Sequence, residues 1–438
     1  KLIKEIELVI IDEISMVRAD IIDFIDKVLR VYSQNMREPF GGKQILLVGD
    51  VYQLEPVVKS DEREILNRFY PTPYFFSARV FNEIELVSIE LTKVYRQTDK
   101  VFVNVLDHIR TNTAGAADLQ LLNTRYGTEI EESESDMYIT LATRRDTVNF
   151  INEKKLAELP GESAILKGEI KGEFPENSLP TLMELELKPG AQIIFIKNDY
   201  DKRWVNGTIG TISGIDENDT LYVITEDGQE LDVKKERWAN IRYRYNEEEK
   251  RIEEEELGVF IQYPVRLAWA ITIHKSQGLT FSRVVIDFTG GVFAGGQTYV
   301  ALSRCTSLDG IQLKKPISRG DIFVRPEIVN FAQRFNNRQA IDKALKQAQA
   351  DIQYKAAVKH FDEGNFEGFL DQFFKAIHSR YDIERPVIKR LIRKKLGIIN
   401  KLKEENRLLK ERMHEQQKNL EKYAKEYYQM GNDCITQA

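Results

Sequence analysis

Residues 8–17 read LVIIDEISMV, an apolar run that ends in two adjacent carboxylates, Asp12 and Glu13. Because the run does not alternate between apolar and polar positions, it predicts a strand buried on both faces, as in the parallel sheets of α/β folds. Such sheets bind ligands at the carboxyl ends of their strands, where the two acids stand. In a nucleotide hydrolase the first acid can hold Mg²⁺, usually through water, and the second can orient or deprotonate the attacking water. A strand that ends in a solvated Asp-Glu turn is the plain alternative.

A second apolar strand is expected at residues 44–48, and it leads into the sequence GDVYQLEPV at residues 49–57. Two buried strands that both deliver polar groups at their carboxyl ends form one edge of a phosphate site. The amide of Gln53 can hydrogen-bond a terminal phosphate, while Gly49 and Asp50 shape the loop. A strand followed by a Gly-Asp turn and a proline stop is the alternative here.

Two further segments each present one arginine: LTKVYRQ contains Arg96, and YVALSR ends in Arg304. Arginine stabilises charge on a transferred phosphoryl group, although for each arginine taken alone a surface ion pair is the favoured interpretation. Between them, residues 270–281 read AITIHKSQGLTF. Hydroxyl, imidazole and ammonium donors on one turn suit a backbone phosphate, and glycine lets the chain approach closely.

The blocks DEISMV, GDxxQLxPV, YRQ, TIHKSQGLTF and YVALSR occur in this order. The series resembles motifs II, III, IV, V and VI of superfamily 1 helicases, in particular the PIF-type and RecD-like branch that moves 5′ to 3′. The resemblance covers roughly residues 1–330. A further segment between motifs II and III is similar to the signature that distinguishes PIF-type enzymes from RecD-like ones. It runs from Ile22 through Asp26 and Arg30 to PFGGKQ at residues 39–44.

The resemblance implies an ATP site between two RecA-like domains and a DNA site beside it. At the ATP site it assigns Asp12 to Mg²⁺, Glu13 to the attacking water and Gln53 to the γ-phosphate. It assigns Arg96 and Arg304 to positive charge that the second domain supplies. The remaining residues near the nucleotide are Gly49, Asp50, Gln277 and Gly278. On the DNA side it assigns Thr272, His274 and Lys275. Thr143, at the start of an expected helix, can cap N–H groups or grip a phosphate, and capping is the favoured interpretation.

The phosphate-cradling segment G-x-x-x-x-G-K-[ST], whose N–H groups and lysine hold the β and γ phosphates, does not occur in the 438 residues. Gly42-Lys43 is similar, but Arg37 stands where the first glycine is required and Gln44 where Ser or Thr would ligate Mg²⁺. We therefore expect a fragment or processed product that has lost this loop. The competing interpretation is a DNA-binding and oligomerising remnant, or a non-catalytic regulator.

Composition sets broad limits. A length of 438 residues with 42% hydrophobic content predicts two to four domains. Cys305 and Cys434 are too few for a disulfide framework, which favours a reducing cytoplasmic or nuclear compartment. No apolar stretch reaches membrane-spanning length, so no membrane partner is expected. A net charge of −6 argues against a protein that coats nucleic acid indiscriminately, but it does not exclude DNA binding, because exposed charges act over ~8 Å and a local basic stripe suffices.

The motor region is expected to have two RecA-like domains. Residues 1–90 would form the remainder of the first domain, with strands near residues 8–12, 45–48 and 85–91. Residues 91–186 and 261–327 would form the second domain, where residues 138–143 predict a strand and a helix follows from about Arg144.

Residues 187–260 show short strands and an Asn-Gly turn signal typical of a small antiparallel barrel. The resemblance implies that this segment is an SH3-like insertion that lies over DNA. Its aromatic side chains are expected in the barrel core rather than stacked on bases: Trp204, Trp238, Tyr243 and Tyr245. The charged run at residues 247–256 predicts a solvated loop or strand margin.

Beyond residue 327 the helicase resemblance fades. Residues 328–385 are expected to be helical, and residues 354–369 resemble a single tetratricopeptide-like hairpin. Residues 386–438 begin with a basic stretch and continue with an a/d heptad series. Asn406 occupies an a position, which favours a specific register in a two-stranded coiled coil. Gln416 weakens the apolar seam. Self-association and a single amphipathic helix docked on the motor both remain open.

The sequence thus predicts an α/β protein with two parallel-sheet motor domains, the first incomplete, a β-barrel insertion and a helical, coiled-coil extension. Its predicted function is ATP-driven 5′ to 3′ translocation on single-stranded DNA and unwinding of duplex at junctions, with ATP and Mg²⁺ as cofactors. By resemblance the expected role is telomere or repair-type maintenance. A RecD-like recombination helicase is the catalytic alternative, which residues 39–44 disfavour.

Overall fold

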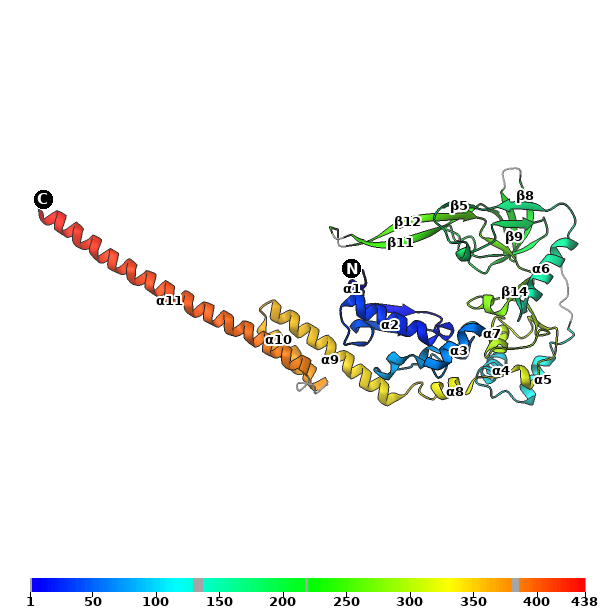
Figure 1. The fold of residues 1–438 in the computed structure, drawn as a ribbon, viewed down its shortest axis with the longest axis horizontal. Helices are drawn as coiled ribbons and strands as arrows, with labels where there is room; N and C mark the ends of the chain where they lie inside the picture. Colours follow the sequence, from blue (N-terminus) through cyan, green and yellow to red (C-terminus); the bar gives the residue numbers. More distant parts are fainter. Residues whose placement is uncertain are drawn as a thin grey trace. The chain divides into compact units, whose positions relative to one another are not determined.

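The computed structural model describes residues 2–128, 137–216, 220–246, 248–249, 251–379 and 386–437. The chain forms two compact units, residues 1–335 and residues 336–438 (Figure 1). Each unit has buried hydrophobic clusters of its own. No described helix is both long and apolar enough to cross a bilayer.

The first α/β region contains a two-stranded parallel sheet. Its elements are α1 (Leu2–Glu5), β1 (Leu8–Ile11), α2 (Ala19–Ser33), β2 (Gln44–Leu47) and α3 (Ser60–Phe69). The two strands pair in parallel from Leu8 opposite Gln44 to Ile11 opposite Leu47. One face of the sheet packs on the core that α2 contributes, which includes Ile22. The two predicted strands are confirmed.

The other face of this sheet is apolar and exposed. Leu8 is 44% exposed, Ile10 59%, Leu46 46% and Val48 43%. The prediction of a strand buried on both faces is therefore wrong for the described structure, because only alternate residues of β1 meet the core.

The third strand predicted in this region, near residues 85–91, is also wrong. Residues 85–95 have no regular secondary structure, and Ile89 and Leu91 are 65% and 90% exposed. A strand needs a neighbour for its N–H and C=O groups, and among the described residues β1 and β2 pair only with each other.

The second α/β region has a four-stranded parallel sheet in the order β14-β3-β15-β16. Its strands are β3 (Ile139–Ala142), β14 (Ala270–Thr272), β15 (Val284–Asp287) and β16 (Ile311–Leu313). Its helices are α4 (Lys100–Arg110), α5 (Ala116–Asn123), α6 (Arg145–Glu158) and α7 (Gln297–Ser303). Every residue of β3 and β15 is buried, and α6 begins one residue after the predicted helix start.

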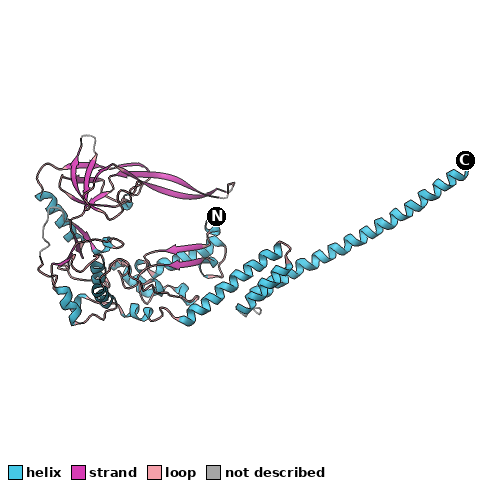
Figure 2. Cartoon of the chain, turned by 180° about the vertical axis from the view of Figure 1, so that it is seen from behind, coloured by secondary structure: helices cyan, strands magenta, loops and turns pink. Residues whose placement is uncertain are grey.

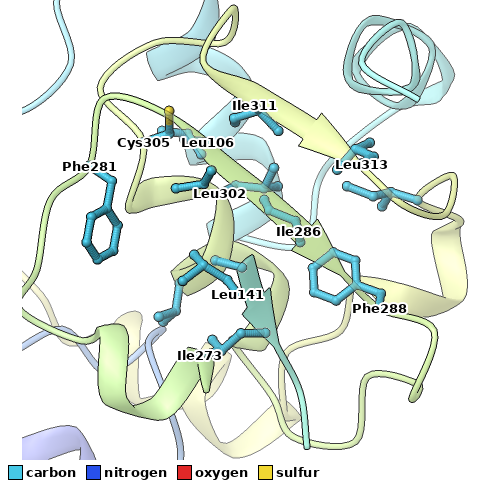
Figure 3. Close-up of a cluster of buried hydrophobic side chains, with 14 of the residues drawn as sticks. Leu106, Leu141, Ile273, Phe281, Ile286, Phe288, Leu302, Cys305, Ile311 and Leu313 are labelled. Atoms are coloured by element: carbon cyan, nitrogen blue, oxygen red, sulfur yellow. The ribbon is translucent and has the colours of Figure 1, made fainter. Parts of the chain in front are cut away.

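The core of this second region draws on both strands and helices. Figure 3 shows Leu141, Ile286 and Ile311 from three neighbouring strands beside Leu106 of α4 and Leu302 of α7. Because this sheet is covered on both faces, the loops at its carboxyl ends stand on a rigid base.

A β-rich module interrupts the second region. A five-stranded antiparallel sheet in the order β10-β9-β8-β7-β13 comprises β7 (Gln192–Phe195), β8 (Ile209–Ile215), β9 (Leu221–Thr225), β10 (Glu230–Val233) and β13 (Val265–Leu267). Beside it lie β4 (Ala164–Lys167) paired with β6 (Glu184–Leu187), and β5 (Glu169–Gly172) paired with a long hairpin of β11 (Glu236–Asn246) and β12 (Arg251–Gln262). The predicted bounds of 187–260 are too narrow, because Leu166, Leu185 and Val265 share one core with Phe195.

The aromatic residues of this module differ in their burial. Trp204 is 4% exposed and stacks on Phe195 with ring centroids 4.5 Å apart, as expected for a core residue. Trp238 is partly buried, whereas Tyr243 is 57% exposed, which contradicts its expected place in the core. The side chain of Tyr245 lies outside the described part of the structure.

The charged run at residues 247–256 is not simply a loop. From Arg251 onward the chain is strand β12, and Glu255 and Glu256 form ion pairs with arginines of β11, Arg244 at 2.7 Å and Arg237 at 3.1 Å. Residues 247 and 250 lie outside the described residues.

The described part of the second unit consists of helices joined by short turns (Figure 2). It contains α9 (Arg338–Asp362), α10 (Phe366–Ser379) and the 52-residue α11 (Pro386–Gln437). A small core of Ala350, Tyr354 and Ala376 joins α9 to α10, with Ile392 of α11 against it. The extension predicted from residue 328 begins later than expected, since α8 (Pro326–Ala332) places Ile328 in the core of the first region.

Candidate nucleotide site and DNA-binding turn

The two predicted catalytic carboxylates lie directly after β1. Asp12 is exposed and Glu13 partly buried, and the Glu13 N–H donates to Asp12 Oδ1 at 2.8 Å. Glu13 has φ 50° and ψ 44°, a left-handed conformation that is uncommon outside glycine and that concentrates at functional sites. The Ile14 N–H donates to the carbonyl of Val48 at 3.0 Å, which ties this turn to the end of β2.

Gly49 allows the two strand ends to meet. Its φ is 152°, and a Cβ at this position would lie 2.9 Å from the backbone nitrogen of Ile14. The glycine of the predicted loop is therefore required by close backbone approach, which brings the loop that carries Gln53 beside Glu13.

Gln277 joins this edge to the second region. Its Nε2 donates to Glu13 Oε2 at 3.0 Å and to Gln53 Oε1 at 3.2 Å. Its Oε1 is buried and has no partner within the described residues. Gln277 thus forms one hydrogen-bonded cluster with two predicted site residues that lie more than 200 positions before it in the sequence.

The two predicted arginines lie close to this cluster. Arg96 donates to Thr280 Oγ1 at 2.9 Å and to the Ser303 carbonyl at 3.2 Å. Arg304 is 2% exposed and donates to the carbonyls of Val300 and Leu279, each at 3.2 Å. Neither has the surface position that the ion-pair alternative requires.

Burial destabilises both charges, and repulsion from Arg96 adds to this at Arg304. Burial, followed by the positive charge of Arg96, lowers the pKa of Arg304 to about 10, and Glu13 partly offsets this. Burial also lowers the pKa of Arg96, and the nearby Tyr299 and Glu13 partly offset this. Two desolvated cations beside a carboxylate form a site that an anion such as a phosphate would stabilise.

Sequence reasoning missed Gln97, the neighbour of Arg96. Gln97 is 7% exposed, and its Nε2 donates to the carbonyls of Ser303 at 3.0 Å and Cys305 at 2.9 Å. At the other end of α7, a Cβ on Gly296 would lie 2.3 Å from the Gln53 carbonyl. Both ends of α7 are therefore fixed, and they position Arg304 relative to the Gln53 loop.

Asp50 does more than shape a loop. It accepts from the Tyr52 N–H at 3.1 Å and forms an ion pair with Arg110 of α4 at 3.3 Å, while Arg110 also donates to Glu90 at 2.9 Å. Burial, together with the Asp50 carboxylate, raises the pKa of Tyr299. Arg110 was not predicted, because an arginine at the end of an amphipathic helix carries no signal of its tertiary partner.

The DNA-binding candidates of the second region gather at the turn after β14. Thr272 Oγ1 accepts from the Lys275 N–H at 3.3 Å, and the ring of His274 stacks on Phe293 with centroids 6.4 Å apart. Burial lowers the pKa of His274. Gly278 has φ 80° and no described heavy atom within 4 Å of a Cβ built on it, so its backbone faces open space.

Thr143 differs from its predicted role. The N-cap of α6 is Arg144, no side-chain cap hydrogen bond is present, and Thr143 Oγ1 is buried without a described partner. Capping, the favoured interpretation, is therefore wrong.

Two arginines that the sequence did not single out add positive charge beside this turn. Burial, then Arg266 and Arg145, lower the pKa of Lys275. Burial and Arg145 lower the pKa of Arg266, whose Nε is buried and unpaired among the described residues. Three cations from α6, β13 and the turn after β14 form a local basic patch despite the net charge of −6.

No cluster of three metal-ligating side chains occurs among the described residues. Mg²⁺ that is bound together with a nucleotide has one or two protein carboxylates, phosphate oxygens and water molecules as ligands, so it does not need such a cluster. The exposed carboxylate of Asp12, beside Glu13, fits this requirement.

Comparisons with known proteins identify relatives of this chain. A family model described as PIF1-like helicase matches residues 1–119. The chain is 32% identical over 358 residues to the ATP-dependent DNA helicase Pif1 of Campylobacter jejuni, covering 77% of each protein. It is 33% identical over 318 residues to human ATP-dependent DNA helicase PIF1 and covers 45% of it, so it spans about half the length of the vertebrate relatives.

Solved structures are similar as well. Bacteroides Pif1 in complex with ADP-AlF4 is 40% identical, with a TM-score of 0.69 and coverage of 76% of each chain. Bacteroides Pif1 bound to single-stranded DNA matches with a TM-score of 0.57 over the same share. The resemblance seen in the ordered motifs is confirmed: this chain belongs to the Pif1-like helicase family.

Proposed function

We propose that this chain forms the motor of an ATP-dependent DNA helicase that moves 5′ to 3′ on single-stranded DNA and unwinds duplex at junctions. The observation that carries the proposal is the contact of Gln277 with Glu13 and Gln53. Gln277 follows the turn that contains Thr272, His274 and Lys275, so one short segment connects the nucleotide edge to the DNA-binding turn. Movement at one site would therefore be transmitted to the other.

At the nucleotide edge each residue has a distinct role. Glu13 orients and deprotonates the attacking water, and Gln53 hydrogen-bonds the γ-phosphate. Asp12 would hold Mg²⁺, which supplies charge neutralisation on the β and γ phosphates when it is bound. Gly49 and Asp50 fix the loop, and Gln277 and Gly278 close the nucleotide-proximal side.

Arg96 and Arg304 would neutralise the charge that develops on the transferred phosphoryl group. They come from the second α/β region, whereas Glu13 comes from the first. Hydrolysis then depends on the two regions being closed on each other, and loss of the γ-phosphate removes the anion that offsets the two desolvated cations.

On the DNA side, Thr272, His274 and Lys275 would contact phosphates, with Arg145 and Arg266 adding charge. The hydroxyl of Thr143 is buried and directed toward Gly290, so this side chain would not contact a phosphate. We propose that the five-stranded sheet with its flanking strands is an SH3-like insertion that lies over the DNA, and that the two α/β regions are RecA-like. Because the substrate would be DNA, we expect the protein in the bacterial cytoplasm at the nucleoid or in the nucleus, in repair or telomere maintenance. We also propose that the chain self-associates through α11.

The test begins with these 438 residues, which contain no G-x-x-x-x-G-K-[ST] segment. Titration with a fluorescent ATP analogue and Mg²⁺ measures nucleotide binding, and micromolar affinity would contradict the remnant interpretation. Unwinding is then compared on duplexes with a 5′ or a 3′ single-stranded tail. Unwinding of the 5′-tailed duplex alone supports the proposal for the intact protein. Preference for the 3′ tail, or unwinding without ATP, would overturn it.

A further inference from the structure

The distal part of α11 has an apolar stripe that no other described residue of the same unit covers. Every described side chain from Asn400 to Ile435 is exposed, including Leu409 at 55%, Met413 at 67% and Leu420 at 68%. The proximal part differs, because Lys395 is 8% exposed and forms an ion pair with Asp362 of α9. Figure 1 shows α11 continuing as one straight helix to the C-terminus. The stripe therefore begins where contact with the rest of this unit ends.

The stripe follows a heptad period. Ile399, Asn406, Met413, Leu420, Tyr427 and Cys434 occupy a positions, and Leu402, Leu409, Gln416, Tyr423 and Met430 occupy d positions. Charged residues elsewhere on the helix form intrahelical pairs, such as Arg407 with Glu411 at 2.6 Å. A strict seven-residue repeat is the period of a left-handed supercoil of two helices, and not of a straight helix docked on a globular surface.

We propose that α11 pairs with α11 of a second copy of this chain as a parallel, in-register coiled coil over residues 399–437. The proposal rests on the self-association included in the proposed function, and it adds the partner, the direction and the register. In this arrangement Asn406 of one copy meets Asn406 of the other at the same layer. A buried Asn pair at an a position specifies a parallel two-stranded register at a cost in stability.

Flanking charges also favour the parallel arrangement. Glu405 is at a g position and Lys410 at the following e position, so each copy places Glu405 beside Lys410 of the second copy. The best antiparallel alternative opposes the polar layers of Asn406 and Gln416. It brings Lys410 near Lys410 of the second copy and Arg412 near Arg412 of the second copy, and both pairs repel.

The parallel register gives Cys434 a specific neighbour. Two packed helices have axes about 10 Å apart, and the Cα atoms of each helix lie about 2.3 Å from its axis. The Cα atoms of paired a residues are therefore ~5 Å apart. This is within the range that a disulfide spans. In the antiparallel alternative the two Cys434 residues would be ~69 Å apart, at 1.5 Å per residue. The other cysteine, Cys305, is buried.

The experiment uses the full 438-residue chain. Light scattering at micromolar concentration gives the oligomeric state, and mild oxidation with diamide followed by non-reducing electrophoresis gives the register. We expect a dimer that oxidation links covalently, and Cys434→Ser should abolish the link while leaving the dimer intact. A monomer would overturn the self-association itself. A dimer that cannot be linked would overturn only the parallel register.

A matched pair of substitutions locates the interface. Leu420→Asp at an a position should weaken dimerisation at least about tenfold, since it places a charge in the seam. Leu408→Asp, on the outer face of the same helix and 43% exposed, should leave it unchanged. Equal effects would contradict the proposed seam. Nucleotide binding and ATP turnover of the same variants report separately on the helicase proposal.

Discussion

The two parallel sheets of the motor region differ in what covers them. In β3 and β15 every residue is buried, whereas in β1 and β2 alternate residues are exposed and Ile10 reaches 59%. Both sheets nevertheless carry site residues at their carboxyl ends. The first presents Asp12 and Glu13 on an edge that is open to solvent, and the second leads to a desolvated Arg304.

This difference separates the two requirements of the site. Carboxylates that orient water and hold a hydrated cation function in a polar, accessible turn. Cations that stabilise developing charge act more strongly away from water, and they need a rigid base to stay there. The second sheet, whose central strands β3 and β15 are buried at every residue, provides that base, with α7 held at both ends by Gln97 and Gly296.

The largest effect is expected at the open edge. Glu13→Gln in the intact protein should lower ATP turnover by about a thousandfold, because the amide cannot accept the proton of water, while nucleotide binding persists. Glu7→Gln is the matched control at the amino end of the same strand and should leave turnover unchanged. A steady-state ATPase assay with single-stranded DNA measures both, and a fully active Glu13→Gln variant would remove Glu13 from the mechanism.

The contrast between the sheets can be measured directly with one substitution in each. Ile286→Ala in β15, where Ile286 is 0% exposed, should cost about 2–5 kcal/mol of unfolding free energy. Ile10→Ala in β1 should change it by no more than about 0.5 kcal/mol. Urea unfolding monitored by circular dichroism gives both values.

An equal cost at the two positions would break the comparison. It would mean that the apolar face formed by Leu8, Ile10, Leu46 and Val48 is covered in the protein in solution.

Gln277 tests how the two sheets communicate. Gln277→Ala removes its hydrogen bonds to Glu13 and Gln53, and we expect the DNA-stimulated rate of ATP hydrolysis to fall roughly tenfold. Gln44→Ala, at the amino end of β2 and exposed, is the control. DNA stimulation that survives in Gln277→Ala would show that coupling follows another route.

The smallest effect is a pH dependence of stability from His274. Burial lowers the pKa of His274 below its ordinary value of 6.5, so the unfolded chain binds more protons between the lowered pKa and pH 6.5. The contribution of His274 to stability therefore rises with pH through that window and is lost as pH falls. Thermal unfolding midpoints from pH 5 to 7.5 should show a weaker pH dependence in His274→Gln than in the unsubstituted protein. An identical profile would exclude this residue as the source.

Strong local patterns made much of the site predictable. The apolar runs at β1 and β2 predicted that Asp12, Glu13, Gly49 and Gln53 follow neighbouring strands, and the structure has them after two paired strands. The order of the motifs indicated that Gln277 would lie near the nucleotide edge, and the structure places it against Glu13.

The remaining features depend on tertiary neighbours, which sequence patterns do not report. Residues 85–91 are rich enough in apolar side chains for a strand but have no described strand to pair with. Arg266 and Arg145 are distant in sequence and meet Lys275 only because β13, α6 and the turn after β14 adjoin. Thr143 precedes a helix, yet its hydroxyl is directed toward Gly290, where a Cβ would lie 2.9 Å from it.

The central claim is that charges from both sheets act on one nucleotide. The most direct measurement compares DNA-stimulated ATP hydrolysis and single-strand binding of Arg304→Ala in the intact protein, with the thermal midpoint checked for each preparation and Arg319→Ala as an exposed control. The account predicts that Arg304→Ala loses turnover by about a thousandfold or more while single-strand affinity is retained. Unchanged turnover in a folded Arg304→Ala protein would contradict it.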